Sequence, residues 1–157
     1  MDSSARAASL FEGRFSCTQS IAALFGPRYG LEEASALRLA RGFGMGQAKG
    51  LTCGAVTGAY MVLGLALGPV EGNDREARYR CYDLIREFDR RFSARHGTLS
   101  CSELLGLDMD TEAGRQEAGA RNLFRTACPN FVRDAAAILD EMIAGLDTPA
   151  PPVTSEE

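Results

Sequence analysis

The chain has 157 residues and a mass of 16.8 kDa, which is the size of one ordinary domain. Hydrophobic residues make up 45% of it and charged residues 24%, so a packed core is expected and global disorder is excluded. The net charge of -4 argues against nucleic-acid binding, because such binding needs a basic face to neutralise phosphates. A single histidine excludes a metal site built from several His side chains of one chain.

The sequence predicts a cytoplasmic protein that does not insert into a membrane. Its first 15 residues contain Arg6, Glu12 and Arg14 and no long apolar run, so they do not resemble a secretory signal. An odd number of cysteines, five, does not suit a secreted disulfide scaffold. Residues 50–70 have no charge and the length of a membrane span, but five glycines and Pro69 make them only modestly hydrophobic.

Helical periodicity dominates the chain, and neither an alternating strand pattern nor an Asn-Gly or Asp-Gly hairpin is present. We therefore predict an all-α fold, a compact multi-helix bundle around a buried, glycine-containing central helix. One domain is expected over residues 1–147, and the Pro-rich residues 148–157 are expected to form a disordered tail. Residues 108–121 are expected to add a helical turn or two, and the main helices are predicted at residues 17–25, 31–40, 53–67, 73–96, 102–105 and 129–144.

Four of the five cysteines fall at expected helix starts. Capping-box sequences, Ser-x-x-Gln and Ser-x-x-Glu, surround two of them, a threonine precedes the third and a proline follows the fourth; these are Cys17, Cys101, Cys53 and Cys128. The free N–H groups and partial positive charge of a helix N-terminus favour a thiolate and are expected to lower the pKa of such cysteines. Cys81 instead lies in mid-helix on an apolar stripe, which predicts a buried small hydrophobe.

The spacing of the cysteines does not select one chemistry. There is no Cys-x-x-Cys pair, which counts against a zinc ribbon, a bacterial-type ferredoxin run and a thioredoxin motif. Any shared site must be assembled by the fold from four separate helix ends. The residues alone leave redox or metal chemistry and purely structural thiols equally open. No Ser-His-Asp set, paired-carboxylate signature or phosphate loop is found, so whether the chain is an enzyme stays open.

Glycines cluster near the cysteines. Residues 42–46 read Gly-Phe-Gly-Met-Gly, part of a dinucleotide fingerprint, but they follow a helix and a flexible helix–helix connection is the simpler interpretation. Glycines such as Gly44, Gly46 and Gly54 also let backbone N–H groups approach an anion, including the sulfurs of a cluster. Gly54 and Gly58 share one helix face, which predicts close packing of another backbone there. The partner of this glycine face is either another helix of the same subunit or a helix of a second subunit. The sequence therefore leaves open whether the protein is a homodimer.

The segment Cys53-Gly54-Ala55-Val56-Thr57-Gly58 resembles a family of proteins named for suspected redox activity and for this motif, the C_GCAxxG_C_C family. The segments around Cys17, Cys101 and Cys128 and the glycine-rich residues 41–50 resemble the family's other segments, in the same order. The likeness covers residues 11–143, and Cys81 lies outside the family's cysteine set. A similar domain occurs in some multihaem-type cytochromes, where an iron–sulfur cluster has been associated with such cysteines. Covalent haem is not expected, because the chain has no Cys-x-x-Cys-His.

Three hypotheses follow. In the first, Cys17, Cys53, Cys101 and Cys128 converge to bind an iron–sulfur cluster, most simply [2Fe–2S], and the protein exchanges electrons with a partner protein. In the second, no cofactor is bound and two of these cysteines cycle between dithiol and disulfide, with Cys53 as the attacking thiol. In the third, the chain is a helical interaction module with structural cysteines. All three depend on where the fold places the four sulfurs.

Overall fold

The computed structural model of the protein describes residues 2–147. Within this part the chain is helical, and its one β-type contact is an isolated bridge between Thr52 and Ser100. The all-α prediction is confirmed, while the predicted tail, residues 148–157, lies outside the described residues. The α-helices are α1 (Ser3–Gly13), α2 (Cys17–Phe25), α3 (Glu33–Ala40), α4 (Gly54–Ala66), α5 (Arg75–His96), α6 (Cys101–Leu105), α7 (Glu112–Ala120), α8 (Leu123–Thr126) and α9 (Cys128–Asp147).

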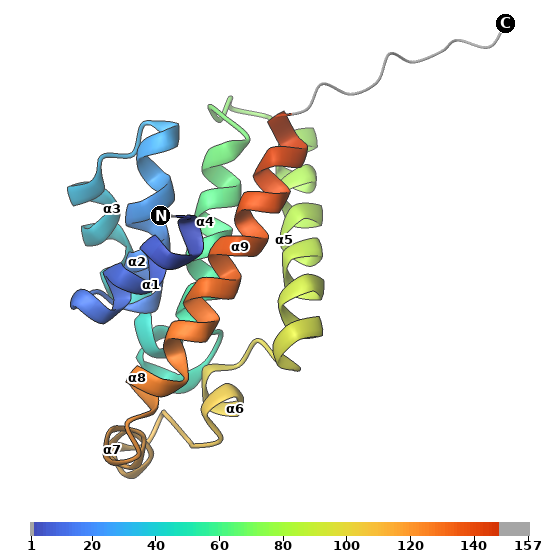
Figure 1. Ribbon diagram of the computed structural model, residues 1–157. Coiled ribbons are helices and arrows are strands. Elements are labelled where there is room, and N and C mark those ends of the chain that lie inside the picture. The colour runs from blue at the N-terminus through green and yellow to red at the C-terminus, as the bar shows by residue number, and fades with distance from the viewer. Residues whose placement is uncertain (1, 148–157) are drawn as a thin grey trace, which may run out of the picture.

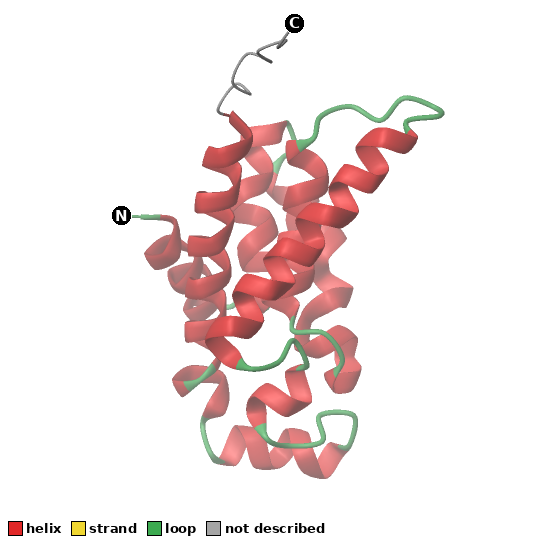
Figure 2. Cartoon of the chain, turned by 90° about the vertical axis from the view of Figure 1, so that its right-hand side faces the viewer, coloured by secondary structure: helices red, strands yellow, loops and turns green. Residues whose placement is uncertain are grey.

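The bundle is built around α2, α4 and α9, which pack on one another (Figure 1). Helix α1 packs against α9 and α2, and α3 packs against α2. Helix α5 packs on α4 and α9 from the other side and runs obliquely across the bundle (Figure 2). The short helices α6, α7 and α8 gather at one end, beside the glycine-rich segment that precedes α4 (Figure 1).

The core is aliphatic and aromatic, and α4 supplies its centre. Its largest fully buried side chains come from α2, α4, α5 and α9, including Phe25, Leu63, Phe88, Phe92 and Leu139. Burying each removes a large apolar surface from water, which stabilises the fold by about 1.5–3 kcal/mol per side chain. The prediction of a buried, glycine-containing central helix is therefore confirmed.

Two glycines of α4 explain how closely it lies against α2. A Cβ at Gly58 would lie 2.9 Å from Cβ of Ile21 and 3.2 Å from the Thr18 carbonyl oxygen. A Cβ at Gly54 would lie 2.6 Å from Oγ1 of Thr18. These separations are shorter than ordinary contacts, so the two helices approach over a face that has no side chains. This is the close packing that the shared glycine face predicts.

Several element boundaries differ from the sequence prediction. Helix α1 was not predicted, because most of its residues are small or polar and only Leu10 and Phe11 are large and apolar, which is too few to show a helical period. Helix α7 lies within residues 108–121, where a helical turn or two was expected, and it is capped by Thr111, whose Oγ1 accepts the Gly114 N–H at 3.0 Å.

The predicted inward stripe of α5 is only partly buried. Phe88 and Phe92 are buried, whereas Ala77 and Cys81, nearer the N-terminal end, are half-buried. Cys81 belongs to no cluster of buried apolar residues and lines a surface cavity with residues 67–72 instead. The prediction that Cys81 is a core residue is wrong, because the oblique course of α5 carries its first turns away from the other helices.

The glycine-rich connection is not a featureless loop. Met45, Gly46, Gln47 and Ala48 have φ values of 52°, 58°, 56° and 63°, which makes residues 45–48 a left-handed turn. Three of these residues carry a Cβ, and each left-handed non-glycine residue costs about 1–2 kcal/mol. Such strain persists only where the surroundings hold it, and it is concentrated at functional sites.

In the described part of the chain, none of the helices combines the length and the apolar character that a bilayer span requires. Within residues 50–70, the 13-residue helix α4 begins only after the cap residue Cys53 and ends at Ala66.

Candidate functional site

The four cysteines predicted to form a site line one cavity of about 210 Å³. The cavity lies at the end of the bundle where α2, α4, α6 and α9 begin. Its other walls are mostly apolar, and none of its lining residues carries a charge; they are Phe11, Ser16, Met45, Gly54, Leu104, Leu105, Phe124 and Phe131. The fold therefore brings thiols from remote stretches of the chain to one cavity, although no cationic side chain lines it.

Local capping places two of the four sulfurs. Ser16 caps α2, with its Oγ accepting the Gln19 N–H while Gln19 Oε1 accepts the Ser16 N–H, so Cys17 is the first residue of the helix. Ser100 Oγ accepts the Glu103 N–H and sets Cys101 at the start of α6. The capping box predicted at Ser100 is only half formed. The Glu103 carboxylate does not accept the Ser100 N–H, because it accepts a hydrogen bond from the Thr98 hydroxyl instead.

The other two cysteines also lie at helix starts. Cys128 is the first residue of α9. Thr52 does not cap α4 as predicted: Cys53 itself occupies the cap position, with extended φ and ψ of −49° and 135°, and the helix begins at Gly54. The amides of Ala55 and Val56, in the first turn of the helix, act to lower the pKa of the Cys53 thiol.

Backbone hydrogen bonds hold Cys53 beside Cys101. The Cys53 N–H donates to the Leu99 carbonyl at 2.7 Å, and the Cys101 N–H donates to the Leu51 carbonyl at 2.6 Å. The bridge between Thr52 and Ser100 lies between them. Two cysteines that are 48 positions apart in the sequence therefore start their helices side by side.

The three glycines that the sequence singled out all lie against the cysteine segments. A Cβ at Gly44 would lie 2.7 Å from Cβ of Ser16, and one at Gly46 would lie 2.8 Å from Cβ of Cys101. A Cβ at Gly54 would lie 3.1 Å from Cβ of Cys17. Only glycine permits these approaches, and Gly46 also has the positive φ that glycine tolerates best.

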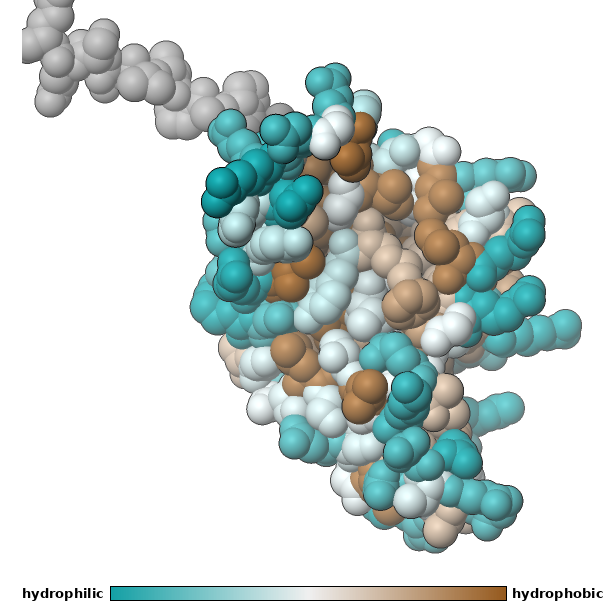
Figure 3. Space-filling view, turned by 180° about the vertical axis from the view of Figure 1, so that it is seen from behind, coloured by the Kyte–Doolittle hydropathy of each residue, from teal (hydrophilic) through white to brown (hydrophobic). Residues whose placement is uncertain are grey.

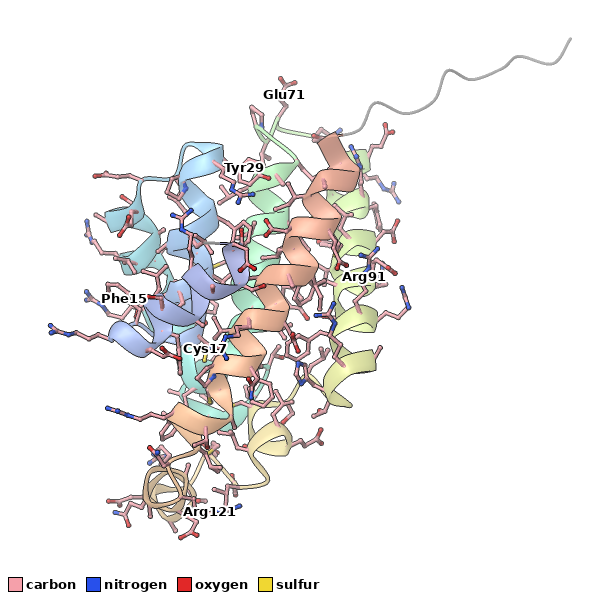
Figure 4. All side chains as sticks on the ribbon, in the orientation of Figure 1. Phe15, Cys17, Tyr29, Glu71, Arg91 and Arg121 are labelled. Atoms are coloured by element: carbon pink, nitrogen blue, oxygen red, sulfur yellow. The ribbon has the colours of Figure 1, made fainter. Side chains whose placement is uncertain are left out.

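The thiols interact with one another, and Cys17 and Cys128 do so most strongly. Interaction with the Cys128 side chain, and then burial, raises the pKa of Cys17 well above its ordinary value, whereas interaction with Cys17 lowers the pKa of Cys128. Figure 4 shows the Cys17 side chain beside α9, the helix that begins with Cys128.

Burial overrides the helix N-termini at the other two thiols. Loss of solvent raises the pKa of Cys53 to about 12, although the amides of Ala55 and Val56 act to lower it. Burial also raises the pKa of Cys101 to about 11. The expectation that helix starts lower the pKa of all four thiols is wrong for Cys17, Cys53 and Cys101, because desolvation disfavours the charged form. The pKa of Cys128 is lowered, but chiefly by its interaction with Cys17 and to a smaller extent by its own backbone N–H, so Cys53 is not the readiest attacking thiol of the metal-free protein.

The one histidine lies behind the cavity wall. The His96 ring packs between Phe92 and Phe131, with ring centroids 4.7 and 5.0 Å away, and Phe131 lines the cavity. Its Nε2 atom lies 2.7 Å from Oδ2 of Asp134. His96 ends α5 just before Gly97, as predicted, but it packs among aromatic rings with a side-chain exposure of 14% and is not at the cavity surface.

The thiols do not close around a single point. Among residues 2–147, no three His, Cys, Asp or Glu side chains stand close enough together to hold one metal ion. All five cysteines are free thiols. The four cavity cysteines therefore surround a volume rather than a point, and this volume is bounded by soft sulfur donors and apolar side chains.

Comparison with known proteins agrees with the motifs. Residues 15–142 match the model of a family described as "Putative redox-active protein (C_GCAxxG_C_C)". The chain belongs to the C_GCAxxG_C_C family. All four cavity cysteines of this C_GCAxxG_C_C protein lie inside the matched region, and so do Gly44, Gly46 and Gly54. No curated protein and no solved structure matches the chain.

Proposed function

We propose that this C_GCAxxG_C_C protein is an electron carrier in which Cys17, Cys53, Cys101 and Cys128 hold an iron–sulfur cluster, [2Fe–2S], inside the cavity. The observation that carries the proposal is the composition of the cavity wall: four thiols and no charged side chain. Thiolates are the protein ligands that such clusters use, and four of them complete one cluster.

The size of the cavity favours a cluster over a single ion. A tetrahedral metal with sulfur bonds of about 2.3 Å would draw its four sulfurs to about 3.8 Å from one another. No three donors of the described residues are grouped in this way. A two-iron cluster divides its four ligands between two metals and fills more space, which agrees with thiols spread around about 210 Å³.

The protein's own residues would hold the cluster, shield it and neutralise its charge. When bound, the cluster would supply an acceptor and donor of single electrons. Phe11, Phe124 and Phe131 give the cavity an apolar lining, which disfavours added negative charge. The amide groups at the start of α4 act in the opposite direction, because they favour negative charge on the Cys53 sulfur.

Spectroscopy and analysis of the full-length protein, purified without oxygen, test the proposal. We expect visible absorption, with two irons and two sulfides per chain, in wild type and in Cys81→Ser, the matched control outside the cavity. Serine at any of the four cavity cysteines should greatly reduce the bound iron. Colourless, iron-free protein after chemical reconstitution would exclude the cluster.

The contact between Cys17 and Cys128 favours a second candidate, a metal-free dithiol–disulfide couple. In this scheme the Cys128 thiolate attacks a low-molecular-weight disulfide, forms a mixed disulfide and releases one small thiolate. Cys17 loses its proton to solvent and attacks Cys128, which releases the second small thiolate. Two electrons leave the protein, and one Cys17–Cys128 bond forms.

Mass spectrometry separates this candidate from the first. Oxidation of the metal-free protein should remove about two mass units, the two hydrogens of one bridge. Peptide mapping should then find the bridge between Cys17 and Cys128, and Cys17→Ser should abolish it while Cys81→Ser leaves it intact. A reversible bridge in metal-free protein that never acquires iron supports the couple. Absence of both a bridge and iron would leave only the structural role of the cysteines.

A further inference from the structure

An exposed surface beside the cysteine cavity is formed by residues 38–51, and we call it the 38–51 surface. Large apolar side chains of this segment stand open to solvent: Leu39 is 60% exposed, Leu51 is 54% exposed and Phe43 is 38% exposed. Residues of this kind are normally withdrawn from water, and a group of them on one segment marks an interaction site.

The segment has a fixed shape. The Gln47 side chain donates from Nε2 to the carbonyl of Phe43 at 3.3 Å and to the carbonyl of Thr52 at 2.9 Å. It therefore ties the two ends of the left-handed turn together and brings Phe43 near Leu51, the residue before Thr52. These two hydrogen bonds help to hold the left-handed backbone of residues 45–48, so the segment has a defined shape before any partner binds.

The 38–51 surface is also cationic. Arg38, Arg41 and Lys49 are exposed, and none of them is in an ion pair among the described residues. Residues 34–70 contain no Asp or Glu, although the chain as a whole has a net charge of -4. Seen from behind, apolar side chains lie over the middle of the molecule with hydrophilic ones along its edges (Figure 3).

Backbone connects this surface directly to two of the cysteines. Leu51 accepts the Cys101 N–H at 2.6 Å, and Leu51 is two residues from Cys53. Met45, between Phe43 and Gln47, lines the cavity itself. A protein that rests on Phe43 and Leu51 is therefore separated from the thiols by little more than one layer of chain, the short separation that electron exchange requires.

We infer that the 38–51 surface is the docking site for an electron-transfer protein whose own redox centre is surrounded by acidic side chains. The inference rests on the proposed redox function. The cations of the 38–51 surface are the reason why the expected partner is acidic. A segment that exposes both apolar and cationic side chains suits a small, transient interface, which is the usual kind for redox encounters. Complementary charge raises the association rate of such pairs and orients them.

The test uses the full chain and an acidic plant-type [2Fe–2S] ferredoxin as the probe, with binding measured by calorimetry at low and at high salt. Charge reversal of the surface, Arg38→Glu with Arg41→Glu and Lys49→Glu, should weaken binding at low salt by about tenfold or more. The matched control carries the same change of charge at exposed arginines elsewhere, Arg6→Glu with Arg78→Glu and Arg80→Glu. We expect the control to retain most of the affinity.

A second variant, Leu39→Ser with Phe43→Ser and Leu51→Ser, separates contact from long-range charge. It should weaken binding without changing its dependence on salt, and circular dichroism should show that it folds. Absence of ferredoxin binding, equal loss in both charge-reversal variants, or equal binding of a DNA oligonucleotide would overturn the inference. So would self-association that the serine variant abolishes, because the occupant would then be a second copy.

Binding does not require iron, so the two proposals can fail separately. Protein that contains a cluster but does not bind ferredoxin would refute the docking site alone. Iron-free protein that binds ferredoxin through the 38–51 surface would refute the cluster and leave the docking site supported.

Discussion

Alanine at Gly58, compared with alanine at Gly64 in the same helix, measures how tightly α4 packs on α2. Both glycines lie inside α4, and neither has a positive φ. In both cases alanine gains about 1 kcal/mol of helix propensity over glycine. The environments differ: a Cβ at Gly58 meets Ile21 at 2.9 Å, whereas a Cβ at Gly64 meets nothing within 4 Å.

The expected magnitudes follow from that difference. Forcing a methyl group into a packed core costs about 1–3 kcal/mol, which cancels or exceeds the propensity gain at Gly58. Gly58→Ala should therefore lower the free energy of unfolding by up to about 2 kcal/mol. Gly64→Ala should raise it by about 0.5–1 kcal/mol. The difference between the two variants, about 1–3 kcal/mol, isolates the clash because the propensity gain cancels.

Urea unfolding of the metal-free protein, followed by circular dichroism, gives both values. Linear extrapolation with an unchanged m-value is required, since a changed m-value would mean that the unfolded state has changed as well. Equal stabilisation by the two alanines would refute the close approach of α2 and α4. Gly54→Ala extends the series toward the site, because its Cβ would push on Thr18 and Cys17. It should lower iron content as well as stability.

Three further predictions follow from single residues. Ala48→Gly should stabilise the protein by about 0.5–1 kcal/mol in urea unfolding, because Ala48 has a φ of 63° and glycine tolerates that conformation; an unchanged or lower stability would contradict the left-handed turn. Arg90 and Arg91 lower the pKa of Glu87 to about 2 through side-chain hydrogen bonds. That contribution is present above the ordinary carboxyl pKa and is lost as pH falls toward 2, so Glu87→Gln should flatten the acid side of the stability profile. Burial raises the pKa of Cys53 to about 12, so the metal-free protein should lose stability as pH rises above about 9, where only the unfolded chain ionises this thiol; Cys53→Ala should reduce that loss.

The sequence predicted the positions of the cysteines well because capping is local. Ser16 and Gln19 satisfy each other's backbone N–H groups within four residues, and this pattern can be recognised without a fold. Ser100 caps α6 in the same way. The capping at Cys53 was misassigned by one residue, because the thiol takes the cap position that Thr52 was expected to occupy.

The walls of the cavity were not predicted, because they depend on packing between distant segments. Phe11 comes from α1, a helix with a weak sequence signal, and Phe124 comes from the four-residue helix α8. Nothing within a few residues of either indicates that it faces a cysteine. The left-handed turn at residues 45–48 was also missed, because Gln47 and Ala48 carry side chains that disfavour this conformation and nothing in the sequence marks the hydrogen bonds of the Gln47 side chain that accompany it.

The same division between local and distant effects explains why the thiol pKa values were mispredicted. A helix N-terminus lowers a thiol pKa through nearby amides, and the sequence shows where such ends lie. Burial raises it through the loss of water, and burial is a property of the whole fold. At Cys53 both effects are present, and burial is the larger of the two.

The raised pKa values of the cavity thiols affect the assembly of any metal centre at this site. With the pKa of Cys17, Cys53 and Cys101 raised, those cavity thiols are neutral near pH 7 in the metal-free protein. A metal centre must then displace their protons before it can bind, so its assembly becomes less favourable as pH falls. The amides at the helix starts would gain their full effect only after this exchange, when the sulfurs carry negative charge.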